Sequence, residues 1–355
     1  MGTDVTCAKP GAVYIRVFES RLTEGNQAMA ESLLDVTGIG NAVVDIIAQA
    51  PDEFLDDNGL TKGTMTLIDL AEAEALYAKT GPAIECSGGS AANTLAGLAS
   101  LGGTAAFIGK VHDDDLGGIF RHDIRAVGVE YDTPAAADGP PTARCIVLVT
   151  PDAQRTMQTY LGACAELSPR DIDPKLIERV KVTYLEGYLW DPPEAKKAFK
   201  KAAGIAHEAG NKVALNLSDP FCVDRHRTDF RELIGNHVDI LFANETEIVS
   251  LCEVSGFDAA LQEIRGHCDV AVLTRSEKGS VVLTDSEIHI LDAEAVDKVV
   301  DTTGAGDLYA AGFLFGLTRG CDIATCGRLA GKAAAEIIGQ FGARSEKPLA
   351  DLLDF

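Results

Sequence analysis

The sequence has few basic side chains, and long uninterrupted apolar runs are missing from it. Its 355 residues include 31 lysines and arginines against 54 aspartates and glutamates, which gives a formal net charge of −23. Such an acidic chain repels polyanions, so nucleic acid is not an expected partner. No apolar run reaches the roughly 18 residues that a membrane-spanning helix needs, so no membrane contact is expected. With 46% hydrophobic residues, the chain can bury a substantial core in one large domain or two ordinary ones.

Patterns for metal sites and disulfides are missing as well. The nine cysteines are scattered without a Cys-x-x-Cys pair, and Cys321 and Cys326 lie too far apart for a zinc knuckle. The seven histidines show no paired metal spacing. We therefore expect reduced thiols in a cytoplasmic protein.

The most informative segment is a glycine-containing run near the C-terminal end of the chain. Residues 301–307 read Asp-Thr-Thr-Gly-Ala-Gly-Asp and precede an apolar stretch, Leu308–Leu317, with the spacing of a helix. Gly304 and Gly306 let the backbone turn sharply, so that its N–H groups face one point, and the helix adds the positive end of its dipole. Phosphate oxygens fit such a turn. Asp307 then lies where a substrate hydroxyl could lose its proton during phosphoryl transfer, whereas the alternative is an ordinary helix N-cap.

A second group of residues has the chemistry of a site for vicinal hydroxyls. Asp45 supplies a carboxylate that accepts two hydrogen bonds, and Asn93 offers both a donor and an acceptor. Gly88 and Gly89 let a sugar ring approach the backbone. Together these residues describe a ribose site. Taken singly, Asp45 could be a strand-end turn residue and Asn93 a helix cap.

Two other phosphate-binding motifs can be excluded. The run Gly38–Gly40 begins like a dinucleotide-binding turn, but Val43 stands in the place of the third glycine, and β-branched residues follow where a helix should begin. Lys110 and Lys332 each follow a glycine, but neither has the Walker spacing or a following Ser or Thr. The chain therefore lacks both an NAD-binding turn and a P-loop.

From Leu33 onward, short β-branched or apolar runs alternate with longer helical ones. This alternation predicts a mainly parallel central sheet with helices on both faces and a ligand site at the carboxyl ends of its strands. The expected strands are Ala105–Ile108, Val182–Leu185, Val213–Leu217, Val238–Phe242, Val270–Leu273 and Ser280–Leu283, and the expected helices are Asn93–Leu101, Pro193–Ala209, Thr246–Cys252, Leu308–Leu317 and Ala324–Ile338.

Two pairs of segments break the alternation. Val43–Ala48 with Gly63–Ile68, and Arg144–Thr150 with Thr156–Leu161, have strand patterns without intervening helices. They predict a small separate β-sheet, for which an ordinary edge hairpin is the alternative.

The runs at 301–307 and 88–93 resemble the two signatures of the ribokinase-like (PfkB) carbohydrate kinase family, and they occur in the family's order. The strings at 38–46, 216–221 and 244–247 resemble the adenosine kinase branch in particular. The resemblance covers about residues 34–344. It implies an α/β, ribokinase-like fold in residues 33–355, with a small β lid whose strands come from about 43–68 and 144–161. We expect residues 1–32 to form an N-terminal extension, partly disordered, with a docking strand at Val13–Val17 as the alternative.

The resemblance also implies roles for the residues of both sites. On the acceptor side, the matching family positions bind the sugar hydroxyls. These positions are Asp45, Gly88, Gly89 and Asn93, with Asn41 beside them. At the phosphate turn, Asp307 is the expected base, and the amides of Gly304, Ala305 and Gly306 are expected to stabilise the transferred phosphoryl group.

On the donor side, Asn244 and Glu247 match the family's Asn-x-x-Glu motif, which is associated with Mg²⁺ and phosphate. The alternative is a helix cap with a surface acid. Arg155 follows the predicted hairpin turn and is a candidate clamp for phosphate, or a solvated turn residue. By family position, Thr274, Gly279 and Thr303 are expected to border ATP, as is the segment Ala334–Gly342. Some family members bind a monovalent cation near residues 301–304, and the residues here leave that question open.

The predicted activity is transfer of the γ-phosphoryl group of ATP to the 5′-hydroxyl of adenosine, which gives AMP and ADP and places the enzyme in purine salvage. An adenine base would need apolar or aromatic neighbours. The candidates are Met65, Tyr160, Tyr188, Trp190 and above all Phe221, and any of them could instead be a core residue. Two alternatives remain open: a kinase of a free sugar (ribose, fructose) or of another nucleoside such as inosine, and an inactive nucleotide-binding regulator. Either a monomer or a homodimer is compatible with the sequence.

Overall fold

The computed structural model describes residues 33–352 apart from positions 153 and 346, and residues 33–355 form one compact unit. The predicted extension at 1–32 and its alternative strand at Val13–Val17 lie outside the described residues. Within the described residues, no helix combines the length and the apolar composition that a bilayer crossing requires.

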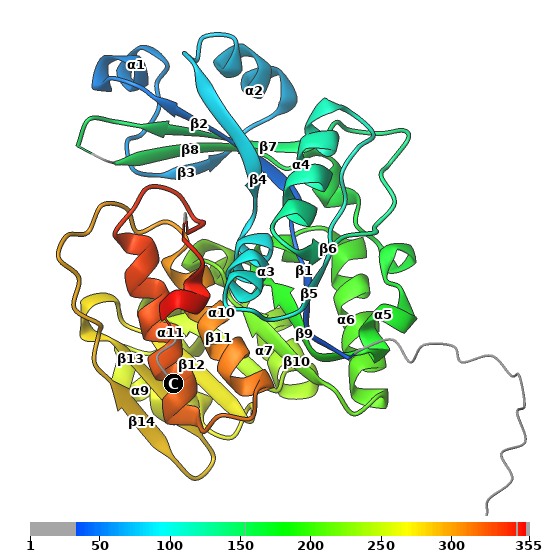
Figure 1. Cartoon of the computed structure of the whole chain (residues 1–355), viewed down its shortest axis with the longest axis vertical. Coiled ribbons are helices and arrows are strands. Elements are labelled where there is room, and N and C mark those ends of the chain that lie inside the picture. Colours follow the sequence, from blue (N-terminus) through cyan, green and yellow to red (C-terminus); the bar gives the residue numbers. More distant parts are fainter. Residues whose placement is uncertain (1–32, 153, 346, 353–355) are drawn as a thin grey trace, which may run out of the picture. The chain divides into compact units, whose positions relative to one another are not determined.

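A large, mainly parallel sheet runs through the unit (Figure 1). Among the described residues it has nine strands, in the order β14-β13-β12-β11-β10-β9-β1-β5-β6. All neighbours from β12 to β6 are parallel, whereas β13 and β14 are antiparallel additions at one edge. The strands are β1 Leu34–Ile39, β5 Ala105–Ile108, β6 Val129–Glu130, β9 Val180–Glu186, β10 Lys212–Asn216, β11 Ile240–Asn244, β12 Val270–Thr274, β13 Ser280–Thr284 and β14 Ile288–Leu291. The prediction of a mainly parallel central sheet is confirmed.

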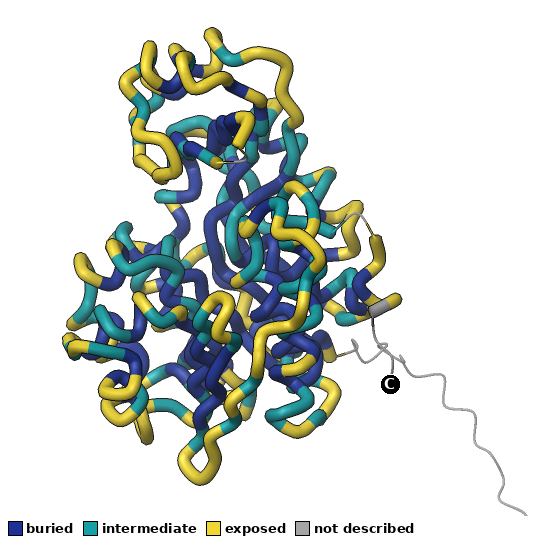
Figure 2. Tube along the Cα trace, turned by 90° about the vertical axis from the view of Figure 1, so that its left-hand side faces the viewer, coloured by how far each residue is buried: buried dark blue, intermediate teal, exposed yellow. Residues whose placement is uncertain are grey.

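Helices cover both faces of this sheet, because its strands bury side chains on both sides. One apolar core lies between the sheet and α3 Ser90–Ser100, α4 Asp115–Ala126, α10 Ala305–Thr318 and α11 Ile323–Ile338. The other lies between the sheet and α5 Pro174–Glu178, α6 Pro193–Glu208, α7 Pro220–His237, α8 Glu245–Cys252 and α9 Phe257–Ile264. Figure 2 shows the buried segments at the centre of these layers. Short 3₁₀ turns lie at Gly162–Glu166, Pro169–Asp171, Gly187–Trp190, Ser276–Lys278 and Leu349–Leu352.

Small residues bring α10 close to its neighbouring helices. A Cβ atom on Gly97 of α3 would lie 2.6 Å from Leu308, and one on Gly312 of α10 would lie 2.7 Å from the Cα atom of Ala330 on α11. Larger residues at either glycine would push these helices apart. The close packing fixes the N-terminus of α10, which follows directly on the glycine run, against the start of α3.

The second sheet, here called the small sheet, has the strand order β3-β8-β7-β2-β4. Its strands are β2 Val43–Gln49, β3 Met65–Leu67, β4 Ala83–Gly88, β7 Ala143–Val149 and β8 Arg155–Tyr160. Helices α1 Asp52–Asp57 and α2 Leu70–Tyr77 cover one of its faces, where Leu55 and Leu76 pack against Ile146 and Leu148 (Figure 1).

The small sheet was predicted from the sequence, but its pairing was predicted only in part. The hairpin of β7 and β8 forms as expected. In contrast, α1 lies between β2 and β3, so the expectation of two strands without a helix between them is wrong. Strand β2 pairs with β7 and β4, and β3 pairs with β8 instead. Periodicity marks a segment as a strand but does not identify its neighbour, which is chosen by packing across the sheet.

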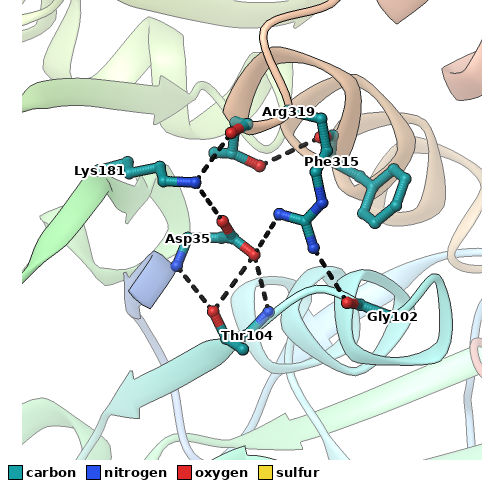
Figure 3. A network of polar contacts seen from close by, with 7 residues as sticks. Asp35, Gly102, Thr104, Lys181, Phe315 and Arg319 are labelled. Atoms are coloured by element: carbon teal, nitrogen blue, oxygen red, sulfur yellow. Dashed lines mark hydrogen bonds and ion pairs between the residues drawn. The ribbon is translucent and has the colours of Figure 1, made fainter. Parts of the chain in front are cut away.

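A buried polar network holds the large sheet to α10, at the end of that helix far from the glycine run (Figure 3). Asp35 on β1, only 3% exposed, accepts hydrogen bonds from Arg319 Nη1 at 2.7 Å, Lys181 Nζ at 2.8 Å and the Thr104 amide at 2.9 Å. Arg319 also donates to the Gly102 carbonyl at 3.0 Å. Burial would raise the pKa of Asp35, but these hydrogen bonds outweigh burial and lower it. The network joins β1, β9, the α3–β5 turn and the C-terminus of α10.

Candidate active site

The glycine run forms the N-terminus of α10, and its two glycines serve different purposes. Gly304 is the N-cap residue, with φ of 77°, and a Cβ atom there would lie 2.8 Å from the Cα atom of Ala343. Any other residue at this position would be strained by the left-handed backbone conformation, and its side chain would also clash with Ala343. Gly306 is helical, and a Cβ atom on it would meet no atom within 4 Å. The expectation that both glycines shape the turn is thus wrong for Gly306, which leaves open space beside the helix start.

Asp301 holds the loop that leads into α10. Its side chain accepts hydrogen bonds from the amides of Thr303 at 3.0 Å and Gly342 at 2.9 Å. Arg155, at the start of β8, forms an ion pair with the same carboxylate. Asp301 is 6% exposed, so this contact between the small sheet and the loop is buried. The predicted phosphate clamp therefore lies beside the glycine run, where a carboxylate of the protein itself engages it.

Asp307 lies in the first turn of α10 and faces the start of α3. Its two carboxylate oxygens accept hydrogen bonds from Ser90 Oγ at 2.6 Å and from Asn93 Nδ2 at 3.4 Å. Burial raises the pKa of Asp307 to about 6, although both hydrogen bonds act in the opposite direction. A carboxylate with this pKa is mainly ionised at neutral pH and is still a useful proton acceptor. Ser90 lies within the 88–93 run but was not among the predicted site residues.

Asp45 and the glycine pair meet where β2 runs beside β4. A Cβ atom on Gly88 would lie 2.3 Å from Asp45 Oδ2, and one on Gly89, where φ is 95°, would lie 2.2 Å from the carbonyl oxygen of Asn41. Burial raises the pKa of Asp45 to about 6, while the charges of Arg344 and Arg155 lower it. The structure thus brings Asp45, Gly88 and Gly89 together, as predicted.

Asn41 is engaged within the protein. Its side-chain amide donates to Glu186 Oε1 at 2.7 Å, and Glu186 Oε2 accepts from the Ala91 amide at 2.8 Å. Burial raises the pKa of Glu186 to about 7. Glu186, at the end of β9, was not predicted, because a lone acid at a strand end carries no sequence signal. It connects the β1–β2 turn to the first turn of α3.

Arg344 also lies in this group and was not predicted. It follows α11 in the sequence, and its guanidinium donates to Asp123 Oδ2 at 3.1 Å and to Asn93 Oδ1 at 3.3 Å. Asn93 is 6% exposed, and both functional groups of its amide have protein partners. No local motif marks Arg344, since its partners lie on α3 and α4, more than 200 residues earlier.

Asn244 and Glu247 form a capping box at the start of α8. The Asn244 side chain accepts from the Glu247 amide at 2.9 Å, and Glu247 accepts from the backbone and side-chain nitrogens of Asn244 at 2.9 and 2.6 Å. Glu247 is 3% exposed, and burial raises its pKa to about 7. The helix-cap alternative is therefore correct for Asn244, whereas Glu247 is no surface acid.

This arrangement does not fit direct coordination of Mg²⁺. Both oxygens of Glu247 are already bonded to Asn244, and a carboxylate with a raised pKa is a weak ligand for a hard cation. Among the described residues, no group of three or more His, Cys, Asp or Glu side chains has the arrangement of a metal site. A metal ion would have to arrive with phosphate and water ligands.

Thr274 and Gly279 flank the turn between β12 and β13. Thr274 pairs with Asn244 across the ends of β11 and β12, so the two lie at the same edge of the large sheet. Gly279 has φ of 78°, and a Cβ atom there would lie 2.0 Å from the carbonyl oxygen of Leu291. Gly279 is thus required by the turn itself.

The aromatic candidates are dispersed. Trp190 is 1% exposed and stacks on Phe230 with ring centroids 5.5 Å apart, so its prediction as a base contact is wrong and the core alternative holds. Tyr160 pairs with Arg144 on the face of the small sheet opposite to Asp45. Phe221 begins α7 and is 73% exposed, so it belongs to no buried wall here. Tyr188 is partly buried, and its pKa is raised by burial and by Asp219 and Glu247.

Strand register assigns a common face of the small sheet to Asp45, Arg155 and a set of apolar side chains. Partners across the strands point to the same side, and alternate residues along each strand share it. We call this the Asp45 face. Its apolar members include Ile47, Met65, Leu67, Ile84, Val147 and Met157, and Val43, Ala143, Cys145 and Val149 lie on the same face. Met65, Leu67 and Ile84 are 38%, 49% and 69% exposed, so this face presents apolar surface beside the partly buried carboxylate of Asp45.

Two open cavities lie away from these residues. One, of about 250 Å³, is lined by His207, His237, Asp239 and neighbouring residues. The other, of about 400 Å³, lies between the opposite face of the small sheet and α4 and is lined by Ile46, Arg144 and others. Neither includes Asp45, Asp307 or the glycine run.

Comparison with known proteins matches residues 64–350 to the pfkB family of carbohydrate kinases. The fold matches an adenosine kinase from Sinorhizobium meliloti at 53% identity, with 90% of this chain and 98% of that chain covered and a TM-score of 0.85. It also matches a probable sugar kinase from Rhizobium etli at 50% identity, with the same coverages and a TM-score of 0.86. An aminoimidazole riboside kinase from Salmonella typhimurium is 30% identical over 70% of this chain and 79% of its own length. The chain belongs to the pfkB family of carbohydrate kinases, next to its adenosine kinase branch, and is a phosphotransferase that acts on an alcohol group.

Proposed function

We propose that this kinase transfers the γ-phosphoryl group of ATP to the 5′-hydroxyl of adenosine. The proposal rests on the presence of two sites in the same unit, one around Asp307 and one around Asp45. Asp307, held by Ser90 and Asn93 at the N-terminus of α10, can act as a base, and Asp45, on a sheet face that also carries Arg155 and several apolar side chains, can bind a sugar. One site handles phosphate and the other a sugar with an apolar substituent.

The transfer itself needs a proton acceptor and a place for negative charge. Asp307 takes the proton of the 5′-hydroxyl, whose oxygen forms the new bond to the γ-phosphorus while the bond to the bridging oxygen of ADP breaks. The first-turn amides of a helix have no partners within the helix, so those of Gly306 and Asp307 are donors for the equatorial oxygens. The Ala305 amide donates to the Thr302 carbonyl at 3.2 Å, and it would have to exchange this bond for one to phosphate. The open space beside Gly306 is what a close approach of phosphate requires.

Nucleosides are favoured over free sugars by the composition of the Asp45 face. Asp45 can accept hydrogen bonds from two vicinal hydroxyls, and Gly88 and Gly89 let the backbone pack closely against the Asp45 carboxylate and the Asn41 carbonyl. The apolar residues Ile47, Met65 and Met157 on the same face then suit a nucleobase, whereas a free sugar would leave them in water. The two similar structures, at 53% and 50% identity, are an adenosine kinase and a probable sugar kinase, so they represent the same two alternatives of nucleoside and free sugar.

The small sheet would act as a lid that excludes water from the transfer. Arg155 would exchange Asp301 for the transferred phosphoryl group when ATP is bound. Mg²⁺ would accompany ATP on its phosphates, with Asn244 and Glu247 contacting only its water shell. Thr274, Gly279 and Thr303 remain candidate ATP contacts. A cytoplasmic role in purine salvage follows from the proposed product, AMP.

The test is ADP release by the purified protein with ATP and Mg²⁺, with adenosine, inosine, ribose and fructose offered separately. Rapid release with adenosine alone would support the proposal. Preference for ribose or fructose would retain the kinase and refute the nucleobase assignment of the Asp45 face. Silence with all four acceptors, together with retained ATP binding, would favour a nucleotide-binding regulator.

The Asp307→Asn variant tests the base. We expect turnover to fall by roughly a hundredfold or more while the Kd for ATP stays within a few fold, because asparagine keeps the shape but accepts no proton. Calorimetric titration with ATP checks the second point. Near-normal turnover in this variant would remove the base assignment.

A further inference from the structure

Arg344 contacts residues that surround the proposed base, and its charge also lowers the pKa of Asp45. It reaches Asn93 through Nε and Asp123 through Nη1, and Asp123 is in turn bonded to the Ser87 amide at 2.8 Å and the Ser87 hydroxyl at 2.5 Å. The guanidinium therefore joins the loop after α11 to α3, α4 and β4. These are the elements that carry Gly88, Gly89, Ser90 and Asn93.

The side-chain amide of Asn93 lies between a hydrogen-bond donor, Arg344, and a hydrogen-bond acceptor, Asp307. Arg344 can only donate, so it faces Asn93 Oδ1, and an ionised Asp307 can only accept, so it faces Asn93 Nδ2. If the amide turned by 180°, its oxygen would face a carboxylate and its NH₂ group would face a guanidinium. Arg344 thereby fixes the one orientation of Asn93 that donates to Asp307.

Stability alone does not explain an arginine at this position. The Arg344 side chain is 20% exposed, and its Nη2 atom is buried without a hydrogen-bond partner among the described residues. Burying a charged group with an unsatisfied donor destabilises a fold, and an ion pair with Asp123 compensates only in part. An apolar side chain would fill the space at lower cost. A role in the site accounts for the arginine.

We propose that Arg344 is a positioning residue that orients Asn93 so that, with Ser90, it fixes the plane of the Asp307 carboxylate. The Ser90 hydroxyl holds one oxygen of Asp307 and the Asn93 amide holds the other, so loss of the second contact frees the carboxylate to rotate about a single bond. Misalignment of a general base affects turnover more than binding. The proposal rests on the function of Asp307 put forward above.

The test is a double-mutant cycle of Arg344→Met and Asn93→Ala, assayed with the acceptor that the wild type uses best. We expect Arg344→Met to lower kcat by roughly tenfold with the KM for ATP within twofold of wild type. In the Asn93→Ala background, the same change should lower kcat less than twofold further, because its route to Asp307 is already gone. The matched control is Arg328→Met, which replaces an exposed arginine on α11 that donates a hydrogen bond to Thr325.

Arg344→Lys guards against a folding failure, since it keeps the charge beside Asp123 and should retain more turnover than the methionine variant. Equal losses from Arg344→Met in both backgrounds, or no loss in either, would overturn the positioning role while the kinase assignment stands. A wild-type protein that phosphorylates none of the acceptors would refute the proposed function, and the role of Arg344 with it.

Discussion

Individual residues at the site are explained by what surrounds them rather than by their type. Gly304 is required by the backbone and by Ala343, and Gly88 by the carboxylate of Asp45, whereas Gly306 is required by nothing inside the protein. The open space beside Gly306, at the start of α10, fits the proposed approach of phosphate. Asp307 also differs from an ordinary capping aspartate, because its carboxylate accepts hydrogen bonds from the side chains of Ser90 and Asn93.

The raised pKa of Asp307 predicts the pH dependence of the reaction. Because the base works only when ionised, kcat/KM should fall on the acid side with a midpoint near pH 6, and about tenfold per pH unit below it. Initial rates between pH 5 and 8 measure this midpoint. Asp45 titrates in the same range, so the Asp45→Asn variant is measured alongside. A profile that stays flat down to pH 5 in both proteins would contradict the assignment.

At the scale of elements, the two helices that begin at the candidate site each start for a different local reason. Helix α8 begins with the reciprocal bonds of Asn244 and Glu247, and α10 begins with the left-handed Gly304. The sequence places both starts correctly to within a few residues, because capping chemistry is local. Strand pairing in the small sheet is not local, and there the sequence misassigned the neighbours of β2 and β3.

The Asp45 face yields a prediction for the edge strand β3. Replacing Met65 and Leu67 together by serine should raise the KM for adenosine roughly tenfold, because apolar contacts with the base are lost, while the KM for ATP stays unchanged. Both side chains are partly exposed, so folding should be preserved.

The control for this variant is Ile288→Ser with Ile290→Ser, which replaces exposed apolar residues on β14, the edge strand of the large sheet. It should leave both KM values unchanged. Steady-state kinetics of the two double variants decide the matter: equal effects on adenosine, or none from the β3 variant, would show that this face does not contact the base.

At the scale of the described unit, the network around Asp35 holds the large sheet to the C-terminal end of α10, while the reactive groups lie at the other end of that helix. The rigid end and the reactive end are thus separate. A change in the network should therefore affect stability and leave the chemistry largely intact.

Asp35→Asn should destabilise the protein by about 2 kcal/mol at pH 7, because it replaces the charge-assisted hydrogen bonds from Lys181 and Arg319 by weaker bonds to a neutral amide. The pKa of Asp35 is lowered by folding, so its contribution is present above the unfolded pKa, near 3.9, and is lost as the pH falls through the folded pKa. The difference between variant and wild type should hence shrink below about pH 4. Thermal unfolding at pH 7, at about pH 4 and at about pH 3 measures it.

The exposed pair of Glu194 and Lys197 provides the control for this prediction. Glu194→Gln removes a solvated ion pair and should leave the unfolding midpoint nearly unchanged. If Asp35→Asn behaved like Glu194→Gln, the network would contribute nothing to stability.

The sequence by itself determined the elements and the motifs. The alternation of strands and helices, the glycine run before α10, the glycine pair before α3 and the cap of α8 are local patterns, each set by a few adjacent residues. Only the tertiary structure decided which distant groups meet. Arg344 with Asn93, Glu186 with Asn41 and Arg155 with Asp301 join segments more than 140 residues apart. Such contacts arise from the packing of whole elements, so no short stretch of sequence encodes them.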